Sequence, residues 1–251
     1  MLLDQCRLPV VLAPLAGGPS TPELCAAVSD AGGLGFLAAG YLSASELATR
    51  IERTQALTSR PFGVNLFVPG ASGDVARVAA YAQRLAGDAE QVGVRLGEPR
   101  WDDDDWAAKL DLLAGSPVAL VSVTFGCPSN EDIVRLKRST GEVWVTVTTV
   151  DEARQAQEAG ADCLVVQGAE AGGHRGGFTD EHEGLGLLAL IQLVRASTST
   201  PLIATGGIMT GAGLAAVLAA GARAGVEDVC AKKKFTEHTT QVPTRARLTP
   251  D

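Results

Sequence analysis

Short apolar segments alternate with longer amphipathic segments along most of the chain. Most of the short segments are apolar throughout, rather than at every second position, as expected for parallel strands that are buried on both faces. Regular alternation of such strands with helices predicts a parallel sheet with right-handed crossovers. The predicted strands are Val10–Ala16, Gly33–Ala39, Phe62–Val68, Val118–Phe125, Val143–Thr149, Asp162–Gln167 and Pro201–Gly206.

Helix start signals lie between several of these strands. Ser43 and Glu46 have the spacing of a capping box. Thr21 precedes Pro22, and proline suits the first position of a helix. Asp151 is expected to cap the helix that ends before Gly160.

The interval between the third and fourth predicted strands is unusually long. Residues 70–116 are expected to form a helical insertion with two helices, Asp74–Val92 and Asp103–Ala114. An insertion of this size at a barrel rim often helps to cover an active site, and a surface insertion without a role is the alternative. The acids Asp102–Asp105 suit the start of a solvated helix, and we predict no metal site there because no other ligands converge on them.

The strand pattern predicts an α/β fold of the TIM (β/α)8 barrel type. Seven strands are visible, and an eighth is expected near residues 223–230. An open doubly wound sheet is the competing architecture. The barrel is favoured because polar and glycine-rich residues follow several separate strands, as they do around the carboxyl rim of a barrel. No G-x-G-x-x-G motif follows the first strand, which argues against a Rossmann dinucleotide site.

Charge and composition narrow the functional classes. The net charge of −8 argues against general binding to nucleic acid or to an anionic membrane surface. No apolar stretch is long enough to cross a bilayer, and no signal peptide opens the chain, so we expect a soluble cytoplasmic protein. The five cysteines lack CxxC spacing and are expected to be reduced thiols.

The segment from Gln167 to Phe178 is the richest in candidate chemistry. It begins at the end of a predicted buried strand, where barrel enzymes place catalytic groups. Gln167 offers both a donor and an acceptor for the polar edge of a heterocycle, and Gly172 and Gly173 allow a ligand to approach the backbone closely. His174 is the candidate base, since an imidazole accepts a carbon-bound proton near neutral pH. The alternative is a histidine that only caps a turn.

A second glycine-rich segment follows the seventh predicted strand. Gly206 and Gly207 end that strand shortly before a helix. Exposed backbone N–H groups and the positive end of the helix together favour an anion, as in many phosphate sites of barrels. The structural alternative is a tight turn between strand and helix.

Two further residues suit a flat cofactor. Leu15 lies among the small residues that end the first predicted strand, where an aromatic ring could rest against the backbone. Asn65 is a polar residue inside a buried strand, and an unpaired buried amide costs on the order of 1–3 kcal/mol. Asn65 therefore needs a partner, either in the protein or on a cofactor.

Three ordered motifs, together with Asn65, resemble those of the nitronate monooxygenase family, formerly called 2-nitropropane dioxygenases. The motifs are Gln-Gly-x-Glu-Ala-Gly-Gly-His-x-Gly at 167–176, Gly-Gly-Ile-x-Thr-Gly-x-Gly at 206–213 and Ala-Pro-Leu-Ala-Gly-Gly at 13–18. The resemblance covers about Pro9 to Ala222. It implies an FMN-binding barrel over residues 1–224, with FMN contacts from Asn65, Gln167, Gly172 and Gly206 and with His174 beside the flavin ring.

The same resemblance implies a reaction. FMN-dependent oxidation of an alkyl nitronate or nitroalkane by O2 would give a carbonyl compound and nitrite, with His174 as the base. Flavin-dependent enoyl-acyl-carrier-protein reductases share the Glu-Ala-Gly-Gly-His core but tend to carry an acid in place of Gln167, so they are the second hypothesis. A degenerate, flavin-free barrel without activity is the third.

The C-terminal end departs from the family. Relatives continue with a strand of the type Gln-Leu-Gly-Thr-x-Phe, whose backbone binds the FMN phosphate, and then with a helical portion. Residues 225–251 lack both patterns, which suggests a truncated or frame-shifted end, a degenerate or missing eighth strand and a loosely ordered tail. Glu227 or Asp228 would face the barrel interior or a phosphate, and either placement is unfavourable for a carboxylate. Homo-oligomerisation would then help to cover the exposed seam.

Overall fold

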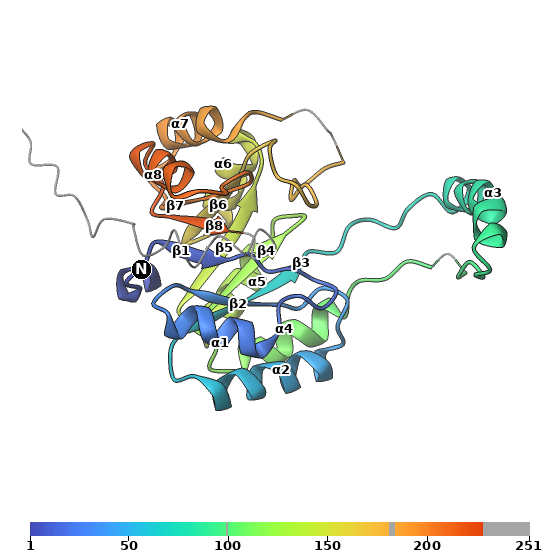
Figure 1. Ribbon diagram of the computed structural model, residues 1–251, viewed down its shortest axis with the longest axis horizontal. Coiled ribbons are helices and arrows are strands. Elements are labelled where there is room, and N and C mark those ends of the chain that lie inside the picture. Colours follow the sequence, from blue (N-terminus) through green and yellow to red (C-terminus); the bar gives the residue numbers. More distant parts are fainter. Residues whose placement is uncertain (99, 181–183, 228–251) are drawn as a thin grey trace, which may run out of the picture.

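Eight parallel strands form a nearly closed barrel in the computed structural model, which describes residues 1–98, 100–180 and 184–227 (Figure 1). The strand order is β1-β8-β7-β6-β5-β4-β3-β2, and β1 and β2 meet through one bridge between Val11 and Leu34. The predicted TIM-type (β/α)8 fold is therefore confirmed. The strands are β1 (Val10–Leu12), β2 (Gly35–Ala38), β3 (Phe62–Phe67), β4 (Leu120–Thr124), β5 (Glu142–Val147), β6 (Cys163–Gln167), β7 (Leu202–Thr205) and β8 (Ala224–Glu227).

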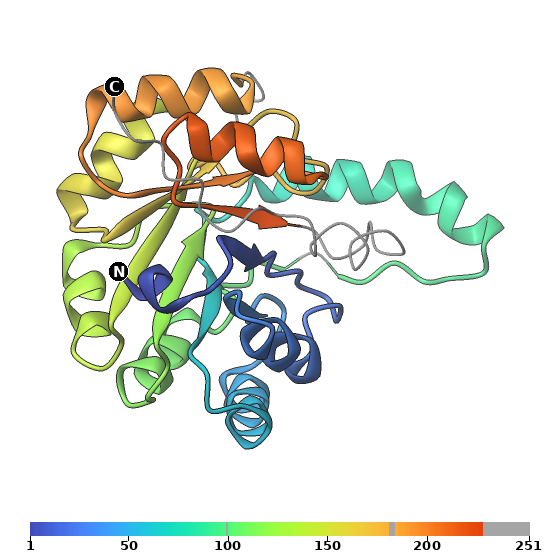
Figure 2. The ribbon, with the colours of Figure 1, turned by 60° about the vertical axis from the view of Figure 1, so that its left-hand side comes forward.

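Most of the helices cover the outside of the barrel (Figure 2). Apolar side chains on their inner faces pack against the outward side chains of the strands and form the larger hydrophobic core. The helices are η1 (Leu2–Gln5), α1 (Pro22–Asp30), α2 (Ala44–Leu57), α3 (Val75–Gln91), α4 (Trp106–Ala114), α5 (Asn130–Lys137), α6 (Val150–Ala159), α7 (Leu187–Ser197) and α8 (Gly211–Ala219). Among the described helices, none is both long enough and apolar enough to cross a bilayer.

The predicted helix caps are confirmed for α1 and α2. Thr21 accepts a hydrogen bond from the N–H of Leu24, and Ser43 and Glu46 form the reciprocal capping box. The prediction for α6 was wrong by two residues. Thr149 caps α6, whereas Asp151 lies in its first turn, because the strand before it ends early enough for Thr149 to take the extended conformation of a cap.

The barrel interior is apolar at its amino-terminal end. Inward side chains from seven of the strands, from Leu34 and from η1 form a second hydrophobic cluster, in which Trp144 is the largest side chain. Leu3 from η1 is 8% exposed and closes this end. A filled lower half leaves the carboxyl end of the barrel as the place for polar chemistry, as is usual for this fold.

The insertion between β3 and β4 contains α3 and α4, as predicted, but the two helices differ in placement. Helix α4 packs against the barrel, and its Leu110 and Leu113 are buried. Helix α3 stands away from the barrel at the end of extended connections in both views (Figures 1 and 2). Only Ala89 of α3 is buried. In this arrangement α3 does not cover the rim.

The eighth strand, expected near residues 223–230 and in a degenerate form if present, is a short strand of four residues. Residues Ala224–Glu227 pair in parallel with β7 on one side and with β1 on the other. Gly225 permits this pairing, because a Cβ there would lie 2.8 Å from a methyl carbon of Leu214. The strand extends three residues beyond the barrel boundary predicted at residue 224. The side chain of Glu227, Asp228 and the remaining tail lie outside the described residues.

Candidate functional site

Polar side chains line the barrel interior near the carboxyl ends of β3, β4, β5 and β6. The Asn65 carboxamide oxygen accepts hydrogen bonds from the hydroxyls of Ser122 (2.7 Å) and Thr124 (3.1 Å). The Thr124 hydroxyl also lies 3.3 Å from that of Thr146. The predicted partner of Asn65 therefore exists within the protein, and no described residue accepts from its amide nitrogen. Asn65 is positioned to present that N–H group at the top of the barrel.

Gln167, at the end of β6, holds the loop that carries His174, defined here as the His174 loop (residues 168–180). Its side-chain nitrogen donates to the His174 carbonyl (3.2 Å), and its oxygen accepts from the Gly176 N–H (2.7 Å). Both ends of the carboxamide thus bind the backbone of the loop. These contacts make Gln167 a support for His174, and its predicted contact with a heterocycle stays a prediction.

Two carboxylates fix the remainder of the His174 loop. Glu152 accepts hydrogen bonds from the Phe178 N–H (2.8 Å) and from the Thr148 hydroxyl (2.9 Å). Glu170 accepts from the Leu187 N–H (2.9 Å), which caps the first turn of α7. Because Gly186, the N-cap residue of α7, provides no side-chain cap, Glu170 supplies the missing acceptor. The loop is therefore anchored to both β6 and its neighbouring helices.

The glycines of the His174 loop have different roles. Gly172 and Gly173 are exposed, and a Cβ at either would meet nothing within 4 Å. Neither has a positive φ. Gly176 is required by close approach, because a Cβ there would lie 2.8 Å from the methyl carbon of Thr146. Open space beside Gly172 and Gly173 leaves room for a ligand over the rim.

The Gly206–Gly207 turn lies directly against the His174 loop. Both residues have positive φ, at 98° and 72°. A Cβ on Gly206 would lie 3.2 Å from the Cβ of Ala171, and one on Gly207 would lie 2.9 Å from that of Glu170. No described residue accepts a hydrogen bond from either N–H. The structure therefore brings the two richest predicted segments together at one rim, with two backbone donors that have no acceptor among the described residues.

The segment after β1 forms a closed turn instead of the predicted longer strand. The Leu15 N–H donates to the hydroxyl of buried Ser20 (2.7 Å), and the Leu15 carbonyl accepts from the Ser20 N–H (3.3 Å). Gly17 and Gly18 have positive φ within this turn. Strand β1 ends at Leu12 because the chain turns back here to enter α1. Leu15 thus has an ordered position at the carboxyl end of β1.

Sequence analysis missed a row of aromatic rings that ends at His174. The ring centroids of Tyr41 and Phe67 are 5.6 Å apart, those of Phe67 and Phe125 are 4.8 Å apart, and those of Phe125 and the His174 imidazole are 5.9 Å apart. All three contacts are edge-to-face, the favourable geometry for aromatic pairs. The available signal was that each aromatic residue ends or follows a predicted strand. We call Tyr41, Phe67 and Phe125 the aromatic row.

Two small cavities lie at the opposite end of the barrel. One, of about 130 Å³, is lined by residues before β1, β2 and β3, including Cys6 and Arg60. The other, of about 160 Å³, lies between Arg195 and Arg223. Neither is lined by any predicted site residue, so we place the candidate site at the carboxyl rim, where the donors and the imidazole gather. Among the described residues, no group of three or more acidic, histidine or cysteine side chains is placed to bind a metal ion.

Known proteins resemble the chain over most of its length. The sequence model of a family described as nitronate monooxygenase matches residues 2–227. The chain belongs to the nitronate monooxygenase family. A nitronate monooxygenase from Paraburkholderia phytofirmans is 40% identical over 223 residues, which cover 86% of this chain and 61% of the relative. A probable nitronate monooxygenase from Staphylococcus aureus is 37% identical, with 85% and 61% covered.

Two solved structures share the fold of this chain. The nitroalkane oxidase from Streptomyces ansochromogenes superposes with a TM-score of 0.87 at 47% identity, over 92% of this chain and 67% of that protein. FabK from Thermotoga maritima gives a TM-score of 0.69 at 29% identity, over 92% of this chain and 60% of that protein. This nitronate monooxygenase family member therefore spans 61% of the length of the curated relatives above.

Proposed function

We propose that this chain is an FMN-dependent oxidoreductase that oxidises alkyl nitronates or nitroalkanes with O2, giving a carbonyl compound and nitrite. The observation that carries the proposal is the contact between the His174 loop and the Gly206–Gly207 turn. The contact brings the loop that carries the candidate base to two backbone donors that have no acceptor among the described residues. Membership of the nitronate monooxygenase family and similarity to a nitroalkane oxidase support this reaction over others.

The exposed residues at the rim fit an FMN molecule. No described residue accepts from the N–H groups of Gly206 and Gly207, which suit a phosphate, and α8 begins four residues after Gly207 with its positive end toward the same turn. The amide nitrogen of Asn65 suits an acceptor on the ring system, and the open surface at Gly172 and Gly173 provides space beside it. Leu15 would contact the ring from the end of β1. FMN, when bound, would supply the electron transfer.

His174 would manage the proton and the negative charge of the substrate. Its side chain is exposed at the rim, while the bonds from Gln167 fix its backbone. In neutral form, the imidazole removes the proton on the carbon that bears the nitro group of a nitroalkane. With a preformed nitronate no proton needs to be removed, and the imidazole only orients the anion. Loss of the imidazole should therefore slow oxidation of a nitroalkane more than oxidation of a nitronate. Comparing the two substrates distinguishes the role of His174 in proton removal from its role in binding.

The proposal is tested with purified full-length chain, supplied with FMN and assayed under air. Titration with FMN should shift the visible flavin bands, and ethyl nitronate should then release nitrite in proportion to protein concentration. Free FMN at the same concentration is the control. A protein that leaves the flavin bands unchanged would favour the flavin-free barrel. Consumption of NADH with an enoyl thioester, without nitrite release, would instead favour a reductase.

A further inference from the structure

Backbone strain in the described part of the chain is concentrated beside the aromatic row. Four non-glycine residues there have positive φ: Tyr41 (66°), Asp104 (55°), Asp105 (56°) and Phe125 (73°). L-residues with bulky side chains rarely adopt this conformation, and such strain persists only where surrounding contacts over-determine it. Tyr41 and Phe125 are themselves members of the row, and both aspartates contact the loop that carries Tyr41.

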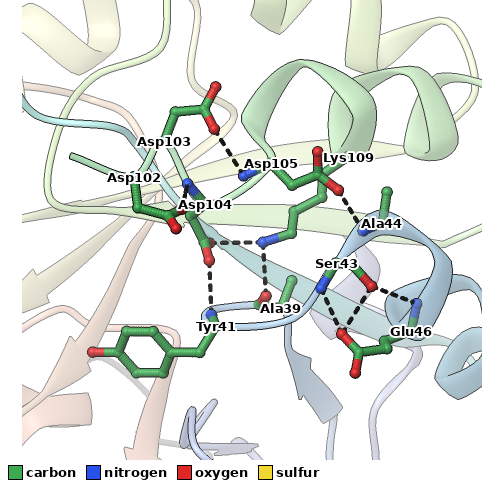
Figure 3. A network of polar contacts seen from close by, with 10 residues as sticks. All are labelled: Ala39, Tyr41, Ser43, Ala44, Glu46, Asp102, Asp103, Asp104, Asp105 and Lys109. Atoms are coloured by element: carbon green, nitrogen blue, oxygen red, sulfur yellow. Dashed lines mark hydrogen bonds and ion pairs between the residues drawn. The ribbon is translucent and has the colours of Figure 1, made fainter. Parts of the chain in front are cut away.

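A buried lysine organises this strained region (Figure 3). Lys109 of α4 is 1% exposed, and its ammonium group donates to the Ala39 carbonyl (2.9 Å) and pairs with the Asp104 carboxylate (2.8 Å). The other oxygen of Asp104 accepts from the Tyr41 N–H (2.7 Å), and Asp105 accepts from the Ala44 N–H (2.8 Å). The acidic run was predicted to start a solvated helix, and exposed Asp105 is the N-cap residue of α4. Asp104 is partly buried instead, because Lys109 and the backbone of Tyr41, 63 residues away in sequence, bind it.

These contacts hold the Tyr41 backbone in its left-handed conformation. The N–H of Tyr41 is bonded to Asp104, and the carbonyl two residues earlier is bonded to Lys109. A buried ammonium group is stable only when it is paired, so Lys109 strongly favours the arrangement in which Asp104 reaches Tyr41. The Tyr41 side chain is nevertheless 68% exposed and leans on Phe67. The strained backbone of Tyr41 and the buried ammonium group of Lys109 thus fix the position of the exposed Tyr41 ring.

The Phe67 ring is fixed in a similar way. A Cβ on Gly40 would lie 2.1 Å from a carbon of this ring, so the ring covers the Gly40 backbone. Phe67 then contacts Phe125, which contacts His174. The exposed end of the row is apolar and carries no charged side chain of its own. A hydrocarbon group extending from a nitronate held at His174 would therefore meet Phe125 first and Tyr41 last.

We propose that Tyr41 is a specificity-determining residue that binds long or aromatic substituents of the nitronate, with Lys109 and Asp104 as its positioning residues. This inference rests on the proposed function, because it takes His174 as the position of the nitronate group. Nitronates of one or two carbons reach only the His174 end of the row. The centroid steps from His174 to Phe125, Phe67 and Tyr41 are 5.9, 4.8 and 5.6 Å, so a chain of about ten carbons is needed to extend along the rings and gain affinity from Tyr41.

The first test compares decyl nitronate with methyl nitronate in nitrite-release assays. Tyr41→Asn removes the ring but retains a residue that tolerates positive φ. We expect kcat/KM for decyl nitronate to fall about tenfold, mostly through KM, which corresponds to burial of about 55 Å² of apolar surface. Methyl nitronate should change less than about twofold. Tyr41→Phe should keep the preference for the longer substrate. Tyr81, an exposed tyrosine on α3, provides the matched control. Tyr81→Asn should leave kcat/KM unchanged for both nitronates. An equal fall for both substrates would overturn the proposal.

The roles of Lys109 and Asp104 are tested by the ratio of kcat/KM for the long nitronate to kcat/KM for methyl nitronate. Lys109→Met keeps the volume of the buried side chain but removes its charge, and Asp104→Asn is a milder second variant in case the first does not fold. In either variant Tyr41 loses its anchor, so the preference for decyl over methyl nitronate should decline toward that of Tyr41→Asn. A general loss of stability would not change this ratio. An unaltered ratio in a folded variant would remove Lys109 and Asp104 from this role.

A second readout requires no turnover. Decanoate carries a two-oxygen anion like that of a nitronate, and its dissociation constant for the FMN-supplied chain can be measured by calorimetry. Tyr41→Asn should weaken decanoate binding about tenfold, whereas equal affinities in variant and parent would overturn the inference. If the parent releases no nitrite but still shows this difference, the proposed function fails, while Tyr41 keeps its role in binding the hydrocarbon chain of an anion. If the parent neither releases nitrite nor binds decanoate, both proposals fail.

Discussion

Replacement of Gln167 by leucine should release the His174 loop without unfolding the barrel. The substitution removes two hydrogen bonds, to the His174 carbonyl and from the Gly176 N–H. At about 0.5–1.5 kcal/mol each, their loss destabilises the closed loop by about 1–3 kcal/mol. Since every 1.4 kcal/mol is tenfold, the open population rises by about five- to 150-fold. The barrel strands make their own ladder bonds and should keep their stability.

Hydrogen–deuterium exchange measures this effect at the relevant amide. The Gly176 N–H should exchange about five to 150 times faster in Gln167→Leu than in the parent, while amides of β5 keep their protection. Gln167→Glu is the informative companion, because a carboxylate still accepts from Gly176 but repels the His174 carbonyl. It should give an intermediate exchange rate. Unchanged exchange at Gly176 in Gln167→Leu would refute the role assigned to Gln167 as the support of the loop.

The other predictions concern packing, pH and thiol reactivity. Gly176→Ala places a Cβ in close contact with two threonine methyl groups, so calorimetry should show a Tm lower by about 2–12 °C; an unchanged Tm would contradict the packing. Hydrogen bonds from Ser43 lower the pKa of Glu46, so the stabilisation from this helix cap is present at neutral pH and is lost as pH falls through the lowered pKa. Glu46→Gln should therefore reduce the dependence of the unfolding free energy on pH in that acid range. Burial raises the pKa of Cys25 to about 12 and also raises that of Cys163, so iodoacetamide mapping of native protein at pH 8 should leave both unmodified.

The strands and most of the fold follow from local patterns in the sequence. Parallel strands buried on both faces read as continuous apolar runs, so seven of the eight were identified within a few residues of their bounds. Helix caps were predicted correctly where only one residue in the segment is a good cap, as for Thr21 at the start of α1. The cap of α6 was misplaced because Thr149 and Asp151 are both good cap residues, and the end of β5 decides between them.

The candidate site was predicted only in part. Glycine-rich strand ends marked His174 and the Gly206–Gly207 turn, because those residue types are needed wherever the chain turns tightly near a ligand. The support from Glu152 and the network around Lys109 were missed, since these contacts join residues far apart in sequence. Lys109 in particular reads as an ordinary surface residue of an amphipathic helix, and only the packing of α4 on the β2–α2 loop buries it.

The role of His174 is tested most directly by comparing nitroethane with ethyl nitronate as substrates for the parent chain and for His174→Asn, with FMN supplied. Proton removal by a general base contributes about 10²- to 10⁴-fold, and asparagine cannot perform it. The rate of nitrite release from nitroethane should therefore fall at least about a hundredfold in the variant, while release from ethyl nitronate falls much less. Equal rates of parent and variant on nitroethane would contradict the account, because His174 would then have no part in the chemistry at this rim.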